Sequence, residues 1–305
     1  MREVPSHEDA EVHEFLAADA AGQADRLERW GFPRAVVAML FNACEARCFF
    51  CANPGTVAVP DAERTRWEAI EAHLRGRPPG ETRLLVGGNE PTAHPDFDRL
   101  LALASELGFT WIELMTSGLR LADPDRLARW VGWGLRSVAV PIYSVDGDVH
   151  DAICGVPSHA RLVAGLDAAR SAGVDVWLHT LALRRTIDGL GQLAAWADAR
   201  WGAPLAVAPL REKAGLFVYD DESVPLSELQ ARLPGLPASL HLVGMPACLD
   251  RGRARGSALV IEMYFRTQLR AYAPLCAGCV DRGGCPGVVA AQLDRWGVDG
   301  LAPRR

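Results

Sequence analysis

Three cysteines in the first fifth of the sequence have the spacing of a metal-binding loop. They are Cys44, Cys48 and Cys51, in the run Cys-Glu-Ala-Arg-Cys-Phe-Phe-Cys, which closely follows a short apolar stretch. Three soft thiolates held this close together can wrap one face of an iron–sulfur cube. A cube has four irons, so one iron is left without a protein ligand and can bind a small molecule. A structural zinc would need a fourth ligand nearby, and none lies close to this loop.

Four more cysteines lie toward the other end of the chain, at Cys248, Cys276, Cys279 and Cys285. The last three form a C-x2-C-x5-C pattern, which by spacing alone suits zinc or an iron–sulfur cluster. If all four bind one cluster, that cluster has no open iron, and its natural role is to accept or relay an electron. If Cys248 is not a ligand, an open iron could hold the substrate instead.

The sequence between residues 34 and 215 predicts the framework that positions these thiols. Short apolar runs that fit buried strands are found at 34–40, 82–88, 110–118, 135–144, 174–183 and 204–210. Helical patterns separate them at 67–76, 96–108, 123–134, 160–173 and 189–202. This alternation indicates an α/β fold with a parallel sheet. Six strands are too few for a complete barrel of ~250 residues, so we expect a partial barrel or an open doubly wound sheet. In either case the chemistry lies on loops after the carboxyl ends of strands.

The cysteine loop resembles the signature of the radical S-adenosylmethionine (radical SAM) superfamily. In addition to the spacing, an aromatic residue, Phe50, stands just before the third cysteine, and the loop follows the first predicted strand. The resemblance covers roughly residues 34–215 and implies a partial (β/α)6 barrel. It implies that Cys44, Cys48 and Cys51 hold a [4Fe–4S] cluster whose open iron chelates the amine and carboxylate of SAM. One electron from the reduced cluster would then cleave SAM to methionine and a 5′-deoxyadenosyl radical.

A glycine-rich segment after the second strand strengthens this resemblance. Gly87-Gly88-Asn89-Glu90-Pro91 looks like the family's GGEP segment, whose backbone and acid meet the SAM amino group. Glycines are needed there because the strand end must approach the ligand closely. Asn89 is inserted before Glu90, so the resemblance leaves open which of the two meets the amine.

Other residues at strand ends resemble the remaining parts of the family's SAM site. Thr116 and Ser117 close the third predicted strand and Ser144 closes the fourth, where small hydroxyl groups would line the site. A cap or turn role is about as common for such residues. Arg184 follows the fifth strand and could place a cation near the SAM carboxylate or the substrate. The alternative is that Arg184 and Arg185 are a solvated charge pair.

The C-terminal cysteines resemble part of the SPASM/Twitch extensions that follow many radical SAM barrels and hold auxiliary clusters. Val289 stands where the full pattern has a further cysteine, and no later cysteine exists. The resemblance therefore implies one auxiliary [4Fe–4S] cluster, with zinc as the alternative. The expected domains are a helical lead-in (1–33), the partial barrel (34–218), a linker (219–239) and the auxiliary-cluster region (240–305).

Cys154 belongs to neither cysteine set. It follows the fourth predicted strand, on a stretch expected to be a loop facing the substrate, so it is a candidate hydrogen donor in catalysis. A buried structural cysteine is the alternative. The flanking His150 and His159 are interpreted as loop or capping histidines.

The composition bounds the function classes. The chain has 305 residues, 49% of them hydrophobic, which is enough to bury a core and excludes a disordered protein. The net charge of −6 gives no basic surface for nucleic acid. The N-terminal segment lacks the pattern of a secretory signal, and no apolar window is long enough to span a membrane. We therefore expect a cytoplasmic protein, whose thiols point to metal ligation or catalysis before disulfides.

These patterns predict a radical SAM enzyme that completes an oxidative cross-link or dehydrogenation with one auxiliary cluster. The substrate is expected to be a peptide or a small metabolite, and the 33 residues before the barrel are too short for the leader-binding domain of some peptide maturases. An electron donor such as flavodoxin or ferredoxin is expected as a partner. The alternatives are a redox-neutral rearrangement or methylation, and a non-enzymatic iron–sulfur or zinc-binding protein.

Overall fold

The core of the protein is a seven-stranded parallel sheet whose strands follow one another in sequence order. The computed structural model describes residues 15, 18–41, 43–51, 64–210, 218–249 and 270–305. The strands are β1 (Val36–Leu40), β2 (Arg83–Gly88), β3 (Trp111–Met115), β4 (Leu135–Pro141), β5 (Asp175–Ala182), β6 (Leu205–Pro209) and β7 (Leu240–Leu242). Each pairs with the next in parallel register, for example Leu40 with Gly88. The predicted α/β partial barrel is confirmed.

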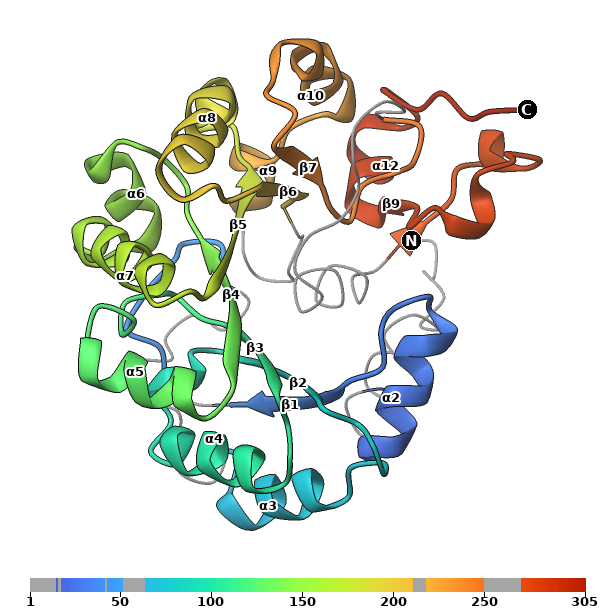
Figure 1. Ribbon diagram of the computed structural model, residues 1–305. Helices are drawn as coiled ribbons and strands as arrows, with labels where there is room; N and C mark the ends of the chain where they lie inside the picture. The colour runs from blue at the N-terminus through green and yellow to red at the C-terminus, as the bar shows by residue number, and fades with distance from the viewer. Residues whose placement is uncertain (1–14, 16–17, 42, 52–63, 211–217, 250–269) are drawn as a thin grey trace.

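Helices connect the strands and cover the outer side of the curved sheet (Figure 1). They are α3 (Trp67–Arg75), α4 (Phe97–Glu106), α5 (Pro124–Gly132), α6 (Gly147–Cys154), α7 (His159–Ser171), α8 (Leu190–Trp201), α9 (Val218–Glu222) and α10 (Leu226–Arg232). Short 3-10 turns follow β2 at Pro91–Ala93, β5 at Ile187–Gly189 and α10 at Leu233–Gly235. All five predicted helices are present, with bounds shifted by a few residues.

The alternation of side chains along each strand produces two buried faces. On β2, Leu84 and Val86 pack into the large cluster beneath the helices, whereas Leu85 belongs to a second cluster on the inner face. Strands buried on both sides read as continuous apolar runs in the sequence. This is why the six longer strands could be predicted from their apolar runs.

The sheet is open, with β1 and β7 at its two edges. At the β1 edge lies helix α2 (Ala20–Arg29), whose buried Gln23 accepts a hydrogen bond from the Val37 backbone N–H at 3.0 Å. The Gln23 side-chain oxygen thus takes the place of a neighbouring strand as the acceptor for this edge-strand N–H. Helix α2 lies within the segment 1–33, which was expected to be a helical lead-in; residues 1–14, 16 and 17 lie outside the described residues.

Two elements differ from the sequence-based expectation. Strand β7 was not predicted, because it is only three residues long and lies after a Pro-rich stretch that was interpreted as a linker. Helix α6 occupies a stretch that was expected to be a loop. It begins where Asp146 accepts hydrogen bonds from the Asp148 and Val149 amides, and it ends at Gly155, with a left-handed φ of 69°. Cys154 is therefore the last residue of a helix.

The described residues 270–305 form the C-terminal region and contain short elements. It contains the two-stranded antiparallel pair β8 (Arg270–Ala271) and β9 (Val288–Val289), two 3-10 turns at Pro274–Cys276 and Arg282–Gly284, and helix α12 (Ala290–Trp296). In Figure 1 this region lies beside the β7 end of the sheet. Among the described residues, no helix combines the length and apolar character that crossing a bilayer requires.

Candidate functional site

The first cysteine set lies on the loop that leaves the carboxyl end of β1. Cys44, Cys48 and Cys51 are all half-buried. The backbone of this loop is fixed by the end of α6: the Arg47 amide donates to the Cys154 carbonyl at 2.8 Å, and the Phe49 amide donates to the Ile153 carbonyl at 3.4 Å. The free carbonyls at a helix end thus become the acceptors that position the cysteine loop.

Glu45, which the sequence analysis did not single out, fastens the same loop on its other side. Its carboxylate accepts a hydrogen bond from the Arg120 Nε at 2.8 Å and forms a second ion pair with Arg161 of α7. Burial tends to raise the pKa of Glu45, but the hydrogen bond from Arg161 and the charge of Arg120 outweigh it and lower that pKa. The loop is therefore bound to the segment after β3 and to α7.

The surroundings of Cys44 and Cys48 raise the pKa of both thiols. Burial, together with the nearby charge of Glu90, raises the pKa of Cys44 to about 12. A hydrogen bond with Cys154 and burial raise the pKa of Cys48 as well. Iron bound to these sulfurs supplies the positive charge that would displace the protons, as metal binding to thiols requires.

The glycine pair at the end of β2 lies against the end of β1. Gly88 has φ 131°, and a Cβ on it would lie 2.0 Å from the Leu40 carbonyl oxygen. The next amide, that of Asn89, donates to the same carbonyl at 3.3 Å. Only glycine fits this turn, which places the half-buried Asn89 beside the start of the cysteine loop.

Glu90 is the centre of a buried hydrogen-bond network that joins the ends of β2 and β3. It is 1% exposed. The Thr116 hydroxyl donates to its Oε1 at 2.7 Å and the Ser117 amide donates to its Oε2 at 2.6 Å, while Thr92 donates through both its amide and its hydroxyl. The structure thus brings together three of the residues predicted to line the SAM site.

The other two predicted strand-end residues have structural partners. Ser144 Oγ accepts a hydrogen bond from the Asp146 amide at 3.0 Å, which is a turn role. Arg184 forms an ion pair with Glu228 of α10. These contacts correspond to the alternatives that the sequence left open, and a role for either residue toward SAM stays a prediction.

Arg185, rather than Arg184, reaches the cysteine loop. Its guanidinium lies 4.4 Å from the centre of the Phe49 ring, between Cys48 and Cys51 in sequence, and its Nε donates to the buried Glu222 at 2.7 Å. A cation over an aromatic face is attracted by the ring electrons. The sequence showed two adjacent arginines after a strand, and nothing local indicated which would face the loop.

Aromatic rings surround the remaining side of the loop. Phe50, predicted from the family pattern, contacts Phe49 at 5.2 Å and Tyr143 at 5.4 Å between ring centres, both edge-on. Tyr143 in turn lies 5.5 Å from the ring of His150 on α6. Phe50 thus packs the cysteine loop against the segment that follows β4.

Cys154 lies directly against this loop. It is 6% exposed, its Sγ lies 3.3 Å from His150 Nε2, and its thiol raises the pKa of Cys48. The prediction that Cys154 acts as a hydrogen donor is not tested by this contact, but its burial agrees with the structural alternative. The sequence could not indicate the Cys48 contact because more than a hundred residues separate the two thiols.

The inner face of the sheet carries a few polar side chains. The alternation along β5 places His179 on the same face as Trp177 and Leu181, in register with Ala206 on β6. Burial lowers the pKa of His179 to about 4, so its imidazole is neutral at neutral pH.

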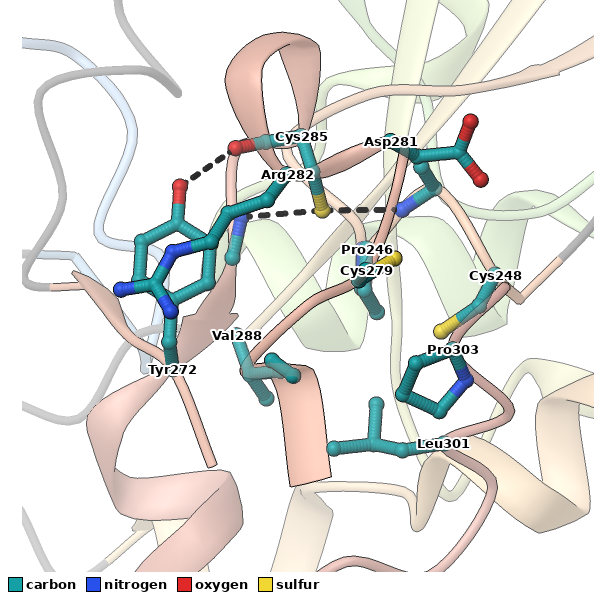
Figure 2. Close-up of a pocket in the computed structure, with 13 residues that line it drawn as sticks. Pro246, Cys248, Tyr272, Cys279, Asp281, Arg282, Cys285, Val288, Leu301 and Pro303 are labelled. Carbon is teal, nitrogen blue, oxygen red and sulfur yellow. Dashed lines mark hydrogen bonds between the residues drawn. The ribbon is translucent and has the colours of Figure 1, made fainter. Parts of the chain in front are cut away.

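The second cysteine set lines one hollow in the C-terminal region (Figure 2). Figure 2 shows the sulfurs of Cys248, Cys279 and Cys285 around this hollow, with Leu301 and Pro303 on its wall. The fourth cysteine, Cys276, also lines it. Burial and the charges of the other three cysteines raise the pKa of Cys276, so each of the three lies within electrostatic range of it.

Backbone amides point at one of these sulfurs. The Ala247 and Gly287 amides donate to Cys285 Sγ at 3.2 and 3.4 Å (Figure 2). Amide donors of this kind stabilise a thiolate and tune the iron–sulfur clusters that thiolates hold. The carbonyl of Cys285 is also fixed, because it accepts a hydrogen bond from the Tyr272 hydroxyl at 2.6 Å.

Both sets fit an iron–sulfur cluster in their donor chemistry. Within the described part of the chain, no three His, Cys, Asp or Glu side chains are arranged to enclose a single metal ion. Around a tetrahedral zinc the sulfurs would lie about 3.8 Å apart, as Zn–S bonds of 2.3 Å require. A cubane is larger, and cysteine thiolates are the ligands that hold it.

The comparison with protein families decides the assignment. The chain matches the family model of the radical SAM superfamily over residues 39–197, which include the cysteine loop and the strand ends described above. The chain belongs to the radical SAM superfamily. The family prediction is therefore confirmed, and membership makes the chain an enzyme of a family that uses a [4Fe–4S] cluster and SAM. Which of its own residues bind these cofactors stays a prediction.

Curated radical SAM proteins match parts of the chain. It is 26% identical over 163 residues to a PqqA peptide cyclase of Streptomyces rochei, covering 53% of the chain and 44% of that relative. It is 33% identical over 129 residues to the mycofactocin maturase MftC of Mycobacterium ulcerans (strain Agy99), covering 41% of the chain and 34% of the relative. The chain thus spans less than half the length of these two relatives.

Solved radical SAM structures share the fold. The structure of Streptococcus suis SuiB bound to S-adenosylmethionine matches with a TM-score of 0.51 at 16% identity, covering 69% of this chain and 49% of SuiB. The structure of anSMEcpe with bound AdoMet matches with a TM-score of 0.52 at 17% identity, covering 66% of this chain and 56% of that protein. At these identities the likeness concerns the fold alone.

Proposed function

We propose that this radical SAM enzyme modifies a peptide by a net oxidation, either a cross-link or a dehydrogenation. The observation that carries the proposal is the three-thiol loop after β1, facing the Gly88 turn and the Glu90 network, together with four thiols around a second hollow. A peptide is favoured over a small metabolite because a matched relative is a PqqA peptide cyclase. A structure of anSMEcpe with AdoMet and the Cp18Cys peptide, with a TM-score of 0.51, supports the same choice.

The chain's own residues prepare the first site. Cys44, Cys48 and Cys51 hold the [4Fe–4S] cluster, and the Gly88 turn lets the β2 end come close to it. When bound, the cluster and SAM supply a 5′-deoxyadenosyl radical that removes a hydrogen atom from the substrate. In this proposal Asn89 or Glu90 meets the SAM amine, as the resemblance of Gly87–Pro91 to the family's GGEP segment implies.

In this proposal the C-terminal hollow holds an auxiliary cluster that accepts an electron, which makes the overall reaction an oxidation. Four cysteines close the auxiliary cluster to direct substrate binding, so its role is to take up an electron. A substrate that gives up one hydrogen atom, then one electron and one proton, loses two hydrogens overall. The first electron comes from a donor such as flavodoxin or ferredoxin.

The proposed domain limits are 1–33, 34–218, 219–239 and 240–305. Strand β7, at the start of the last segment, pairs with β6 of the barrel sheet. A cytoplasmic location, where thiols stay reduced, suits such an enzyme.

Anaerobic reconstitution followed by product analysis tests the proposal. The wild-type protein is expected to bind about eight irons, four per cubane, and to release 5′-deoxyadenosine on reduction with SAM. Supplied with a peptide encoded next to its gene, it should give a product two hydrogens lighter. An unchanged mass or an added methyl group would contradict the oxidation, and zinc in place of iron would contradict the cofactor assignment.

A further inference from the structure

The cysteine loop carries an arginine whose charge the fold does not use. Arg47 stands between Cys44 and Cys48, and it is exposed. In the part of the chain that the structure describes, its guanidinium has no hydrogen-bond or ion-pair partner. Because an exposed charge of this kind contributes little to stability, folding alone does not explain a cation at this position.

The backbone holds Arg47 in its exposed position. The Arg47 amide donates to the Cys154 carbonyl at 2.8 Å, at the end of α6. Gly155, the next residue, packs so closely that a Cβ on it would lie 2.7 Å from the Arg47 carbonyl oxygen. The end of α6 therefore fixes the place at which the Arg47 side chain leaves the loop.

Positive charge exceeds negative charge around this loop. Arg120 and Arg161 pair with Glu45, and 34% and 51% of their side chains are exposed. A second acid, Asp151, lies about one turn before the end of α6. Together with Arg47, three arginines thus stand against two acids. The whole chain has a net charge of −6, so the excess of positive charge is local to the loop.

We propose that Arg47, together with the exposed parts of Arg120 and Arg161, forms the docking surface for an acidic one-electron carrier protein that reduces the SAM-binding cluster. The inference rests on the proposed function, because it takes Cys44 and Cys48 as ligands of that cluster. In the step itself the carrier is oxidised by one electron and the cluster is reduced by one electron, from its +2 to its +1 state. No bond forms or breaks.

The charge and the size of the surface both suit this kind of partner. Charges of opposite sign steer two proteins into contact and raise the rate of association. Complexes that transfer electrons are small and transient, so a surface of three arginines is sufficient. Arg47 directly precedes Cys48 in the sequence. A carrier bound to Arg47 therefore lies beside the cluster loop, as electron transfer over a short distance requires.

The test compares charge variants at Arg47 with a matched control. Arg47→Glu reverses the charge, and Arg47→Lys keeps it. The control is Arg170→Glu, which changes the net charge of the chain by the same amount. Arg170 is exposed and lies nine residues after Arg161 on α7, about 14 Å along the helix axis. All proteins carry Cys279→Ala, so that the first cluster alone is followed.

The probe is a flavodoxin of known negative net charge. Surface plasmon resonance measures the binding of oxidised flavodoxin to each variant. Stopped-flow absorbance measures the second-order rate constant with which flavodoxin hydroquinone reduces the reconstituted cluster. Photoreduced deazaflavin, a small molecule that needs no docking surface, serves as the second reductant. Each measurement is made at low and at high ionic strength.

We expect Arg47→Glu to bind flavodoxin more weakly and to be reduced by it about tenfold more slowly at low ionic strength, the lower end of the range by which steering raises association rates. The difference should shrink at high ionic strength, because salt screens exposed charges. Arg47→Lys and Arg170→Glu should remain close to the wild type. Deazaflavin should reduce all variants at the same rate.

The outcomes separate this inference from the proposed function. Equal flavodoxin binding and equal rates for the wild type and Arg47→Glu would overturn the docking surface and leave the cluster assignment intact. The binding measurement does not need the cluster, so it is decisive even if Arg47→Glu takes up less iron. If Cys48→Ala retained the iron content of the wild type, the proposed function would fail first.

Two further results would also overturn the docking surface. An equal loss of flavodoxin binding in Arg170→Glu would show that the net charge of the chain, rather than the cysteine loop, attracts the carrier. An equally slow reduction of Arg47→Glu by deazaflavin, with unchanged flavodoxin binding, would show that the substitution acts on the cluster itself.

Discussion

Replacing Gly88, at the end of β2, with alanine should lower the free energy of unfolding and disturb the site. The added Cβ would lie 2.0 Å from the Leu40 oxygen, 2.7 Å from its carbonyl carbon and 2.9 Å from its nitrogen, all backbone atoms that cannot rotate away. Forcing atoms into a packed position costs about 1–3 kcal/mol. Holding alanine at a φ of 131° costs about 1–3 kcal/mol more. The free energy of unfolding should therefore fall by about 2–6 kcal/mol.

Gly80 provides the matched control for this substitution. It precedes the same strand and has φ 81°, but a Cβ on it would meet nothing within 4 Å. Gly80→Ala therefore carries only the backbone strain, about 1–2 kcal/mol. Urea unfolding of both variants, followed by circular dichroism under anaerobic conditions, measures the difference. Because Gly88 also positions Asn89, SAM binding should weaken in Gly88→Ala alone. Equal destabilisation of the two variants, or full SAM binding by Gly88→Ala, would refute the close approach of β2 to β1.

Three further perturbations test other parts of the site. Glu45→Gln removes the carboxylate charge that pairs with Arg120 and Arg161. Because these groups are partly exposed, the free energy of unfolding should change by less than about 1 kcal/mol, but the cysteine loop should lose iron faster to a chelator. An unchanged rate of iron loss would contradict the role of Glu45 in holding the loop. Cys279→Ala should still cleave SAM but form no oxidised product, and normal turnover would contradict electron uptake by the second cluster. Acidification should destabilise the fold through His150. The pKa of His150 is about 4 in the folded protein, compared with an ordinary value of 6.5, so the unfolded chain binds the proton at a higher pH. The free energy of unfolding should therefore fall by about 1 kcal/mol between pH 7.5 and 5.5. His150→Gln should remove this part of the pH dependence, and an unaltered dependence would contradict the buried neutral ring.

Local sequence patterns were enough to predict the parts of the site that a single segment builds. The spacing of Cys44 and Cys48 and the need for glycine at Gly88 both concern neighbours in the chain, and both were found. The six longer strands were found for the same reason, since each is an apolar run between turn residues. Strand β7 was missed because three residues carry too little periodicity to separate a strand from a linker.

Contacts between distant segments could not be predicted in the same way. The thiol contact of Cys48 with Cys154 depends on the packing of the cysteine loop against the end of α6, which no spacing encodes. The choice between Arg184 and Arg185 depends on which of two successive side chains faces the loop at the end of β5. The sequence does contain residues typical of both ends of α6, Asp146 at its start and Gly155 after its end. Only eight residues lie between them, which is short for a helix.

The central claim is that the thiols after β1 hold a cluster with one iron open to SAM, and electron paramagnetic resonance of the reduced protein tests it directly. The measurement uses Cys279→Ala, so that only the first cluster contributes, and compares it with the variant that also carries Cys48→Ala. Adding SAM should change the spectrum of Cys279→Ala and yield 5′-deoxyadenosine, whereas the double variant should show neither. A spectrum of Cys279→Ala that SAM leaves unchanged, with no 5′-deoxyadenosine formed, would contradict the claim.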